Sequence, residues 1–182
     1  EFNAEGIAFY DRFIDDLIAR GIEPMVCLYH FDMPLALGQE YNGFNDRRVV
    51  EAFIRYGKKM IDCFGDRVKY WLTFNEQNIF HMPIAFRISG YMKGEETLRE
   101  LYEVQHHTMV AHMALTEYLH QTKPGKLMGG MLAHQLIYPA TCKPRDIFCA
   151  QQYDEFLNQN LLRVFAGQGY SPAVMAVVEQ EG

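Results

Sequence analysis

Apolar residues recur along the chain in segments that alternate between helical and strand-like spacing. Helical spacing predicts helices over residues 4–20, 46–64, 95–122 and 144–165, with a short helix after Pro172. Short, mostly apolar runs separate them and predict buried strands at residues 22–29, 69–74 and 126–136. Alternation of this kind is typical of a parallel sheet with helices packed against it.

Residues that favour helix ends support these boundaries. Asn3 can cap the first helix, while Gly21 and Gly65 suit the ends of the first and second helices. The first helix is expected to have one apolar face, made by Phe9, Tyr10, Phe13, Ile14, Leu17 and Ile18. Residues 30–45 contain proline and glycine and are interpreted as a loop.

Two architectures fit this order of elements, an open doubly wound sheet and a (β/α)8 barrel. No glycine-rich G-x-G-x-x-G motif or phosphate-binding P-loop follows a strand, which weakens the nucleotide-binding version of the open sheet. Polar residues gather at the C-terminal end of each predicted strand, where barrel enzymes place their sites: His30 and Asp32, Asn75 and Glu76, His134 and Gln135. Since a barrel needs eight strands, about three strands predict only part of one.

Composition narrows the classes of function. The chain of 182 residues is 49% hydrophobic and 14% aromatic, with a net charge of -6 and no basic stripe, so a nucleic-acid partner is not expected. No apolar run approaches the length of a membrane span, so no membrane partner is expected. Four dispersed cysteines predict buried free thiols in a reducing compartment, the cytoplasm. Because Glu1 replaces an initiator methionine, we expect an interior piece of a longer protein.

The segment Thr73-Phe74-Asn75-Glu76 carries the clearest chemical signal. A carboxyl group held among apolar side chains at a strand end loses hydration, which favours its neutral form and lets it donate a proton. A leaving glycosidic oxygen needs such a proton. Asn75 and Glu76 can share a pocket only if the strand end twists or bulges. By spacing alone, a solvated Asn-Glu pair at a strand–loop junction is the alternative.

His30 and Asp32 follow the preceding strand. An imidazole there can bind a sugar hydroxyl group, while Asp32 can orient the loop. The alternative is a structural loop in which the histidine forms its hydrogen bonds within the protein and binds no ligand. A metal site is not expected, because no H-E-x-x-H motif accompanies this pair. His106 and His107 are adjacent on a predicted helix and point about 100° apart, so we expect one packed and one exposed side chain.

Several segments, in order, resemble glycoside hydrolase family 1. They are Phe9-Tyr10-Asp11, residues 28–37 (LYHFDMPLAL), residues 43–47 (GFNDR) and residues 70–76 (YWLTFNE). The resemblance implies a (β/α)8 barrel and a retaining glycosidase that needs no metal or organic cofactor. It implies that Glu76 is the catalytic acid/base and that His30 and Asn75 bind the sugar substrate. Phe44 stands where the family usually has Trp, a departure expected to be structural.

Residues 138–146 (YPATCKPRD) and the segment Glu76-Gln77-Asn78 are similar to the 6-phospho-β-glucosidase branch of this family. The expected whole is therefore a cytoplasmic enzyme that hydrolyses 6-phosphorylated β-glucosides. The alternatives are a β-glucosidase acting on unphosphorylated sugar, and an inactive stable fragment or sugar-binding remnant.

The nucleophile strand and the phosphate-gripping loops implied by the resemblance have no match in the sequence. Residues 1–182 are thus expected to be one fragment of a single catalytic barrel, about strands three to five with their helices. By itself the fragment is expected to be inactive and to self-associate.

Overall fold

The computed structural model describes residues 2–83 and 86–180. In chain order the main elements are α1 (Ala4–Ala19), β1 (Met25–Tyr29), α2 (Leu35–Tyr41), α3 (Arg47–Phe64), β2 (Tyr70–Phe74), α4 (Leu98–Thr122), β3 (Leu127–Gly129), α5 (Pro144–Asp154), α6 (Asn160–Phe165) and α7 (Pro172–Gln180). Short 3-10 turns lie at Gly43–Asn45, Gln77–Ile79 and Phe86–Ser89, and a π-helical turn at Glu155–Gln159.

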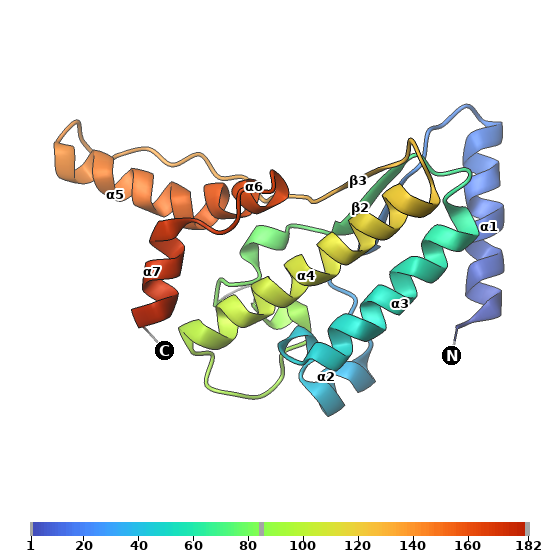
Figure 1. Ribbon diagram of the computed structural model, residues 1–182, viewed down its shortest axis with the longest axis horizontal. Coiled ribbons are helices and arrows are strands. Elements are labelled where there is room, and N and C mark those ends of the chain that lie inside the picture. Colours follow the sequence, from blue (N-terminus) through green and yellow to red (C-terminus); the bar gives the residue numbers. More distant parts are fainter. Residues whose placement is uncertain (1, 84–85, 181–182) are drawn as a thin grey trace.

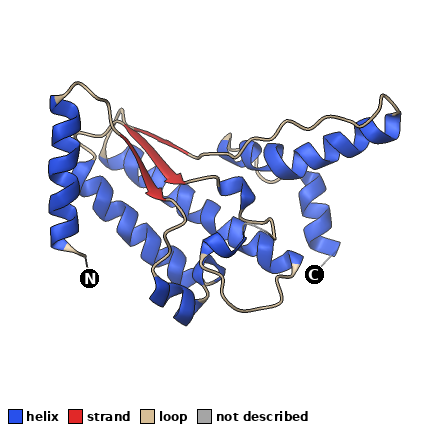
Figure 2. Ribbon diagram, turned by 180° about the vertical axis from the view of Figure 1, so that it is seen from behind, coloured by secondary structure: helices blue, strands red, loops and turns tan. Residues whose placement is uncertain are grey.

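The three strands form one parallel sheet in the order β1-β2-β3. Tyr29 pairs with Phe74, and Leu72 pairs with Gly129. Helices α3 and α4 cover one face of this sheet in Figure 1, and the view from behind in Figure 2 shows the strands in front of them. The structure confirms the predicted parallel α/β fragment, in which the carboxyl ends of all three strands lie along the same edge.

Local side-chain caps explain where the helices begin. The Asn3 side chain accepts a hydrogen bond from the backbone N–H of Gly6 at 3.0 Å, which confirms it as a helix cap. Asp46 caps α3 through the N–H of Arg48. Thr97 and Glu100 form a reciprocal capping box at the start of α4, so this helix begins at Leu98, three residues after the predicted start.

The core lies between the sheet and helices α3 and α4. Its centre is an aromatic cluster in which Phe74 of β2 packs against Phe53 of α3, with ring centroids 4.6 Å apart. Phe44 joins the same cluster and is 1% exposed, which confirms a structural role for this position. Helices α3 and α4 approach closely at Gly57, where an added Cβ atom would lie 2.6 Å from the Leu115 side chain.

The prediction that residues 30–45 form a loop is wrong in part, because α2 and a 3-10 turn occupy this stretch. Helix α2 has only seven residues, too few to show a helical repeat in the sequence. It ends at Asn42, which has the left-handed backbone conformation typical of a helix C-terminus. The Asn42 side chain also accepts the backbone N–H groups of Met92 and Lys93, so it joins α2 to a distant loop.

The third strand is shorter than predicted, since only Leu127–Gly129 pair in the sheet. The Phe165 ring packs on Gly130, where an added Cβ atom would lie 2.1 Å from the ring. Beyond Gly130, the side chains of Asn78 and Asn158 form the hydrogen bonds to the backbone that a neighbouring strand would otherwise form. Asn78 exchanges hydrogen bonds with the backbone of Ala133 at 2.8 and 3.1 Å, and Asn158 donates to the Gln135 carbonyl at 2.9 Å.

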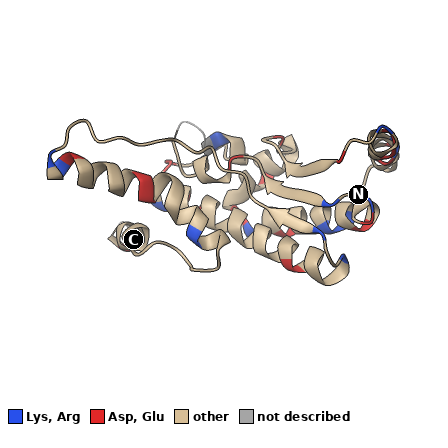
Figure 3. Ribbon diagram, turned by 90° about the horizontal axis from the view of Figure 1, so that it is seen from above, with Lys and Arg blue, Asp and Glu red and all other residues tan. Residues whose placement is uncertain are grey.

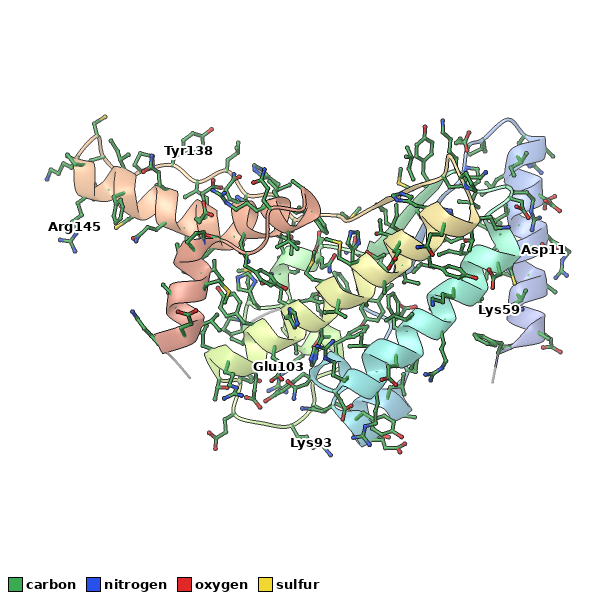
Figure 4. The ribbon with its side chains drawn as sticks, in the orientation of Figure 1. Asp11, Lys59, Lys93, Glu103, Tyr138 and Arg145 are labelled. Carbon is green, nitrogen blue, oxygen red and sulfur yellow. The ribbon has the colours of Figure 1, made fainter. Side chains whose placement is uncertain are left out.

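The predicted continuous helix over residues 144–165 is interrupted by a π-helical turn at Glu155–Gln159. The Asp154 carboxylate accepts hydrogen bonds from the side chains of Asn158 and Gln159 at 2.7 and 2.9 Å, which accompany this turn. Residues 136–143 run beside α5, and together they form a projection that we call the arm (Figure 1). Tyr138 and Arg145 extend from the arm in Figure 4, and no residue of α5 is buried.

The predicted apolar face of α1 is present, but most of it is exposed. Ile14 is buried, while Phe9, Tyr10 and Phe13 remain 48–55% exposed. Charged residues are dispersed over the helices in Figure 3, with both signs on most of them. No helix in the described part of the chain has the length and apolar character to cross a membrane. All four cysteines are free; Cys27 and Cys63 are half-buried, but Cys142 and Cys149 are exposed, against the prediction of buried thiols.

Candidate active site

The carboxyl ends of β1 and β2 bring two predicted site residues to neighbouring positions. Tyr29 and Phe74 are the last paired residues, and the backbone N–H of Asn75 donates to the Tyr29 carbonyl at 2.9 Å. His30 and Asn75 therefore follow a matched pair of residues on adjacent strands. Asn75 is 6% exposed, whereas His30 is exposed. The structure thus places Asn75, Glu76 and His30 along one edge of the sheet.

Glu76 lies two residues after the end of β2 and has a left-handed backbone, at φ 46° and ψ 49°. A twist or bulge at this point was predicted as the condition for Asn75 and Glu76 to share a pocket. The structure shows a left-handed residue here, and a shared pocket stays a prediction. A non-glycine residue in this region costs about 1–3 kcal/mol and persists only where its surroundings enforce it. The side chain is half-buried, and the next residue, Gln77, donates its backbone N–H to the Met131 carbonyl at 2.9 Å.

The His30 backbone is fixed by the residue two positions later. Asp32 Oδ1 accepts the N–H of His30 at 3.0 Å, and Phe31 between them has φ 67°. The His30 and Phe31 rings meet edge to face, with centroids 5.2 Å apart, and Phe31 also packs near Phe80. A cavity of about 360 Å³ between α1, β1 and α3 includes His30 and Asp32 in its lining. Asn75 and Glu76 are not part of that lining.

A layer of polar side chains joins β2 and the segment after it to α4, and it was not identified from the sequence. Thr73 Oγ1 is 2.8 Å from His112 Nδ1, and burial lowers the pKa of His112 to about 4. His81 accepts a hydrogen bond from Gln105 and stacks on Tyr102, and burial lowers its pKa to about 4 as well. These histidines are neutral near pH 7.

Helix α4 supplies most of this layer, from polar residues three or four positions apart on its buried side. Gln105, Thr108 and His112 are all less than 5% exposed. Their spacing was a usable signal in the sequence, although the helix was predicted from its apolar residues alone. His107 is also buried, donating to the Phe44 carbonyl at 2.7 Å, while His106 is exposed; this confirms the prediction of one packed and one exposed histidine.

The polar residues expected after the third strand lie farther along the extended segment. His134 is exposed, and Gln135 is held through its backbone by Asn158. Across residues 2–83 and 86–180, no three His, Cys, Asp or Glu side chains gather as potential metal ligands.

The arrangement suits sugar chemistry. A carboxyl group at the end of a strand can give and take a proton, and an imidazole and an amide beside it can bind hydroxyl groups. Retaining glycosidases pair such an acid/base with a second carboxylate about 5 Å away. Asp32 lies in the loop after β1. Its carboxylate accepts a hydrogen bond from the backbone N–H of His30 and so helps to fix the conformation of that loop.

The family model for glycosyl hydrolase family 1 matches residues 1–182. The chain belongs to glycosyl hydrolase family 1. This assignment accords with the parallel strands, the polar strand ends and the Thr73–Glu76 segment described above.

Relatives and solved structures place the chain more closely within glycosyl hydrolase family 1. It is 38% identical over 181 residues to 6-phospho-beta-glucosidase AscB of Escherichia coli (strain K12), covering 98% of this chain and 38% of that protein. Aryl-phospho-beta-D-glucosidase BglC of Bacillus subtilis (strain 168) is 35% identical, over 100% of this chain and 38% of that protein. The family 1 β-glucosidase from Thermotoga maritima superposes with a TM-score of 0.88 at 27% identity, over 100% of this chain and 41% of that one.

The chain therefore spans about two fifths of the length of the proteins it matches. Its fold is the corresponding part of a (β/α)8 barrel, as the sequence predicted.

Proposed function

We propose that the protein to which this chain belongs is a retaining glycosidase that hydrolyses β-glucosides carrying a 6-phosphate. In this proposal Glu76 is the acid/base, His30 and Asn75 bind the sugar, and residues 1–182 form part of a single catalytic barrel. No cofactor is required, because proton transfer and a carboxylate nucleophile suffice for glycoside hydrolysis. The partner is a small-molecule sugar.

The observation that carries the proposal is the placement of Glu76 just beyond the carboxyl end of β2. Asn75 precedes it, and the paired strand β1 ends at Tyr29, directly before His30. Active sites of (β/α)8 enzymes lie at this end of the strands. The left-handed Glu76 backbone supports a functional role, since conformations of this cost cluster at active sites.

The proposed specificity for a 6-phosphate is supported by the names of the relatives and not by the residues at the strand ends. Two relatives at 35–38% identity over nearly the whole chain have names that specify a phosphorylated glucoside. A buried phosphate needs Lys or Arg and several hydrogen-bond donors. The described strand-end residues His30, Asp32, Asn75 and Glu76 include no such cation. We propose that residues elsewhere in the complete protein bind the phosphate.

A cytoplasmic location follows from the proposed substrate. A phosphorylated sugar does not cross a membrane unaided, so the enzyme is expected where phosphorylating uptake delivers the sugar.

A second candidate function is hydrolysis of unphosphorylated β-glucosides. Beta-glucosidase 24 of Oryza sativa subsp. japonica is 38% identical over 144 residues, covering 70% of this chain. The Thermotoga maritima structure carries the same kind of name. The acid/base chemistry is shared, so the two candidates differ only in the site for the sugar 6-position.

The deciding experiment measures kcat/KM of the complete protein for one aryl β-glucoside with and without a 6-phosphate. A site built for phosphate leaves its polar groups unpaired with the free sugar and should reject it by a factor on the order of 10⁴. A ratio near one, or one favouring the free sugar, supports the second candidate. Turnover of neither substrate contradicts both.

A further inference from the structure

Gln77 follows Glu76 directly, and its side chain is 0% exposed. Its Nε2 lies 3.1 Å from Thr108 Oγ1 and 3.1 Å from Met109 Sδ, both on α4. Among the described residues, its Oε1 has no hydrogen-bond partner. The polar contact of this side chain with α4 therefore runs through Nε2.

The direction of this hydrogen bond is fixed by Thr108. The Thr108 hydroxyl group has a single proton and donates it to the Gln105 carbonyl at 2.8 Å. Thr108 Oγ1 must then accept from Gln77, which assigns the amide nitrogen to this contact. Removing either the amide of Gln77 or the hydroxyl group of Thr108 breaks the same bond.

Both flanks of Glu76 are held by hydrogen bonds. The N–H of Asn75, before it, donates to Tyr29 at 2.9 Å, and the N–H of Gln77, after it, donates to Met131 at 2.9 Å. The Gln77 side chain adds a third connection, to α4. Because Glu76 lies between these points, its left-handed backbone is determined by its neighbours rather than by its own preference.

We propose that Gln77 is a positioning residue that holds Glu76 in its left-handed conformation by means of the hydrogen bond to Thr108. The inference rests on the proposed acid/base role of Glu76. The direction of the Cα–Cβ bond depends on φ and ψ, so relaxation of Glu76 toward an ordinary conformation moves its carboxyl group. Proton transfer to a leaving group requires hydrogen-bond reach, and a displacement of about 1 Å can greatly slow the reaction.

The test compares Q77M and T108V in the complete protein. Methionine keeps the length of the side chain but lacks the N–H donor, and valine keeps the shape of threonine but lacks the acceptor. The measurement is kcat/KM for a series of aryl β-glucosides, phosphorylated or free as the wild-type protein requires, with leaving groups of graded pKa. In both variants kcat/KM should fall about tenfold for substrates with poor leaving groups and less than about threefold for substrates with good ones, because only poor leaving groups need protonation.

Coupling between the two substitutions provides the second readout. Both single variants remove the hydrogen bond between Gln77 and Thr108, so the loss of kcat/KM in the double variant Q77M/T108V should be smaller than the product of the two single losses. Q121M is the matched control, since Gln121 is an exposed glutamine on α4 whose side chain bonds only Glu117 among the described residues. It should keep the wild-type dependence on the leaving group.

The outcomes separate this inference from the proposed function. A wild-type protein that hydrolyses neither kind of glucoside overturns the proposed function and this inference with it. Wild-type turnover combined with equal losses for all leaving groups in Q77M and T108V overturns the inference alone. If Q77M does not fold, T108V decides by the same criterion, because it removes the same bond from the opposite side.

Discussion

The carboxylate of Asp32 accepts a hydrogen bond from the backbone N–H of His30, with Oδ1 3.0 Å from that nitrogen. The contact spans Phe31, whose backbone is left-handed at φ 67°. Adjacent strands thus end in the same way, since Phe31 and Glu76 are both non-glycine residues with positive φ. In each case a hydrogen bond from a neighbour opposes the cost of that conformation.

Replacing Asp32 tests this arrangement at β1. D32A removes the acceptor for the His30 N–H, so we expect kcat/KM of the complete protein to fall about tenfold as the sugar contact loosens. D32N keeps an acceptor oxygen at the same place and should fall by less than about threefold. Losses of equal size in D32A and D32N would show that the charge of Asp32 matters and its hydrogen bond does not.

Glu76→Gln tests the acid/base role directly. The amide cannot donate a proton to a departing oxygen. The rate of hydrolysis of substrates with poor leaving groups should therefore fall on the order of 10²- to 10⁴-fold. Good leaving groups should be affected less in the glycosylation step, because they depart without full protonation. E103Q, at an exposed glutamate of α4, is the control and should behave as the wild type (Figure 4). Equal losses for both kinds of leaving group in the glycosylation step would contradict the acid role.

The sequence predicted those elements whose pattern is repeated over many residues. Helix α3 has eighteen residues with a continuous buried face, and its cap at Asp46 is local, so both are visible in the sequence. Helix α2 and the early end of β3 depend on contacts with distant segments. Asn42 reaches Met92, and Phe165 packs on Gly130, and neither contact follows from nearby residues.

The candidate site divides in the same way. Glu76, Asn75 and His30 could be predicted as site residues from the sequence, because strand ends and family resemblance indicate them. The hydrogen bonds that join this segment to α4 could not be predicted. Nothing in the sequence indicates a role for Gln77 until its partner Thr108, 31 residues later, is known. Helical spacing alone places Thr108 on α4 without showing what it contacts.

Burial of His112 predicts a pH dependence of stability. Its pKa is lowered to about 4 in the folded state by burial, whereas the unfolded value is about 6.5. Between these values the unfolded chain binds a proton that the folded chain does not, so stability is full above about pH 7 and falls as the pH decreases toward 4. One such group contributes a slope of about 1.4 kcal/mol per pH unit. His81 acts in the same direction.

The measurement is the free energy of unfolding in urea at several values between pH 4.5 and 7.5. H112N, which cannot take up a proton, should flatten the dependence by about the slope of one group. H120N, at an exposed histidine of the same helix, controls for the replacement of a histidine on α4. An unchanged slope in H112N would mean that His112 binds a proton in the folded state as readily as in the unfolded one.

The 182-residue chain produced by itself should show no measurable glycosidase turnover. A retaining mechanism needs two carboxylates about 5 Å apart. Among the described residues that follow β1 and β2, the candidate for a second carboxylate is Asp32, which accepts the His30 N–H. The measurement is the release of an aryl group from β-glucosides with and without a 6-phosphate. Robust release that disappears in D32A would instead identify Asp32 as a second catalytic carboxylate.

The same chain should also self-associate. Large apolar side chains are exposed at many positions, and two groups of them are Phe9, Tyr10 and Phe13 on α1, and Leu136, Tyr138 and Phe148 on the arm. The strands β1 and β3 additionally form the two edges of the described sheet, and open edges favour pairing with another chain. Exposed apolar surface of this extent drives association in water. We therefore expect light scattering to give a mass above the 21.2 kDa of one chain, increasing with concentration.

Charged substitutions distinguish which surface is responsible. F9K/F13K introduces charge on α1, and L136K/Y138K introduces it on the arm, so each pair should shift the distribution toward the monomer if its surface is buried in the contact. Q168K adds a lysine at an exposed position outside both surfaces and should leave the distribution unchanged. If neither pair has an effect, the open strand edges remain, and V26P should reduce association, because the backbone of Val26 alternates with that of Tyr29 and so faces away from β2. A single species of one-chain mass that unfolds cooperatively would contradict self-association, because it would mean that the exposed residues of α1 and the arm are tolerated in water.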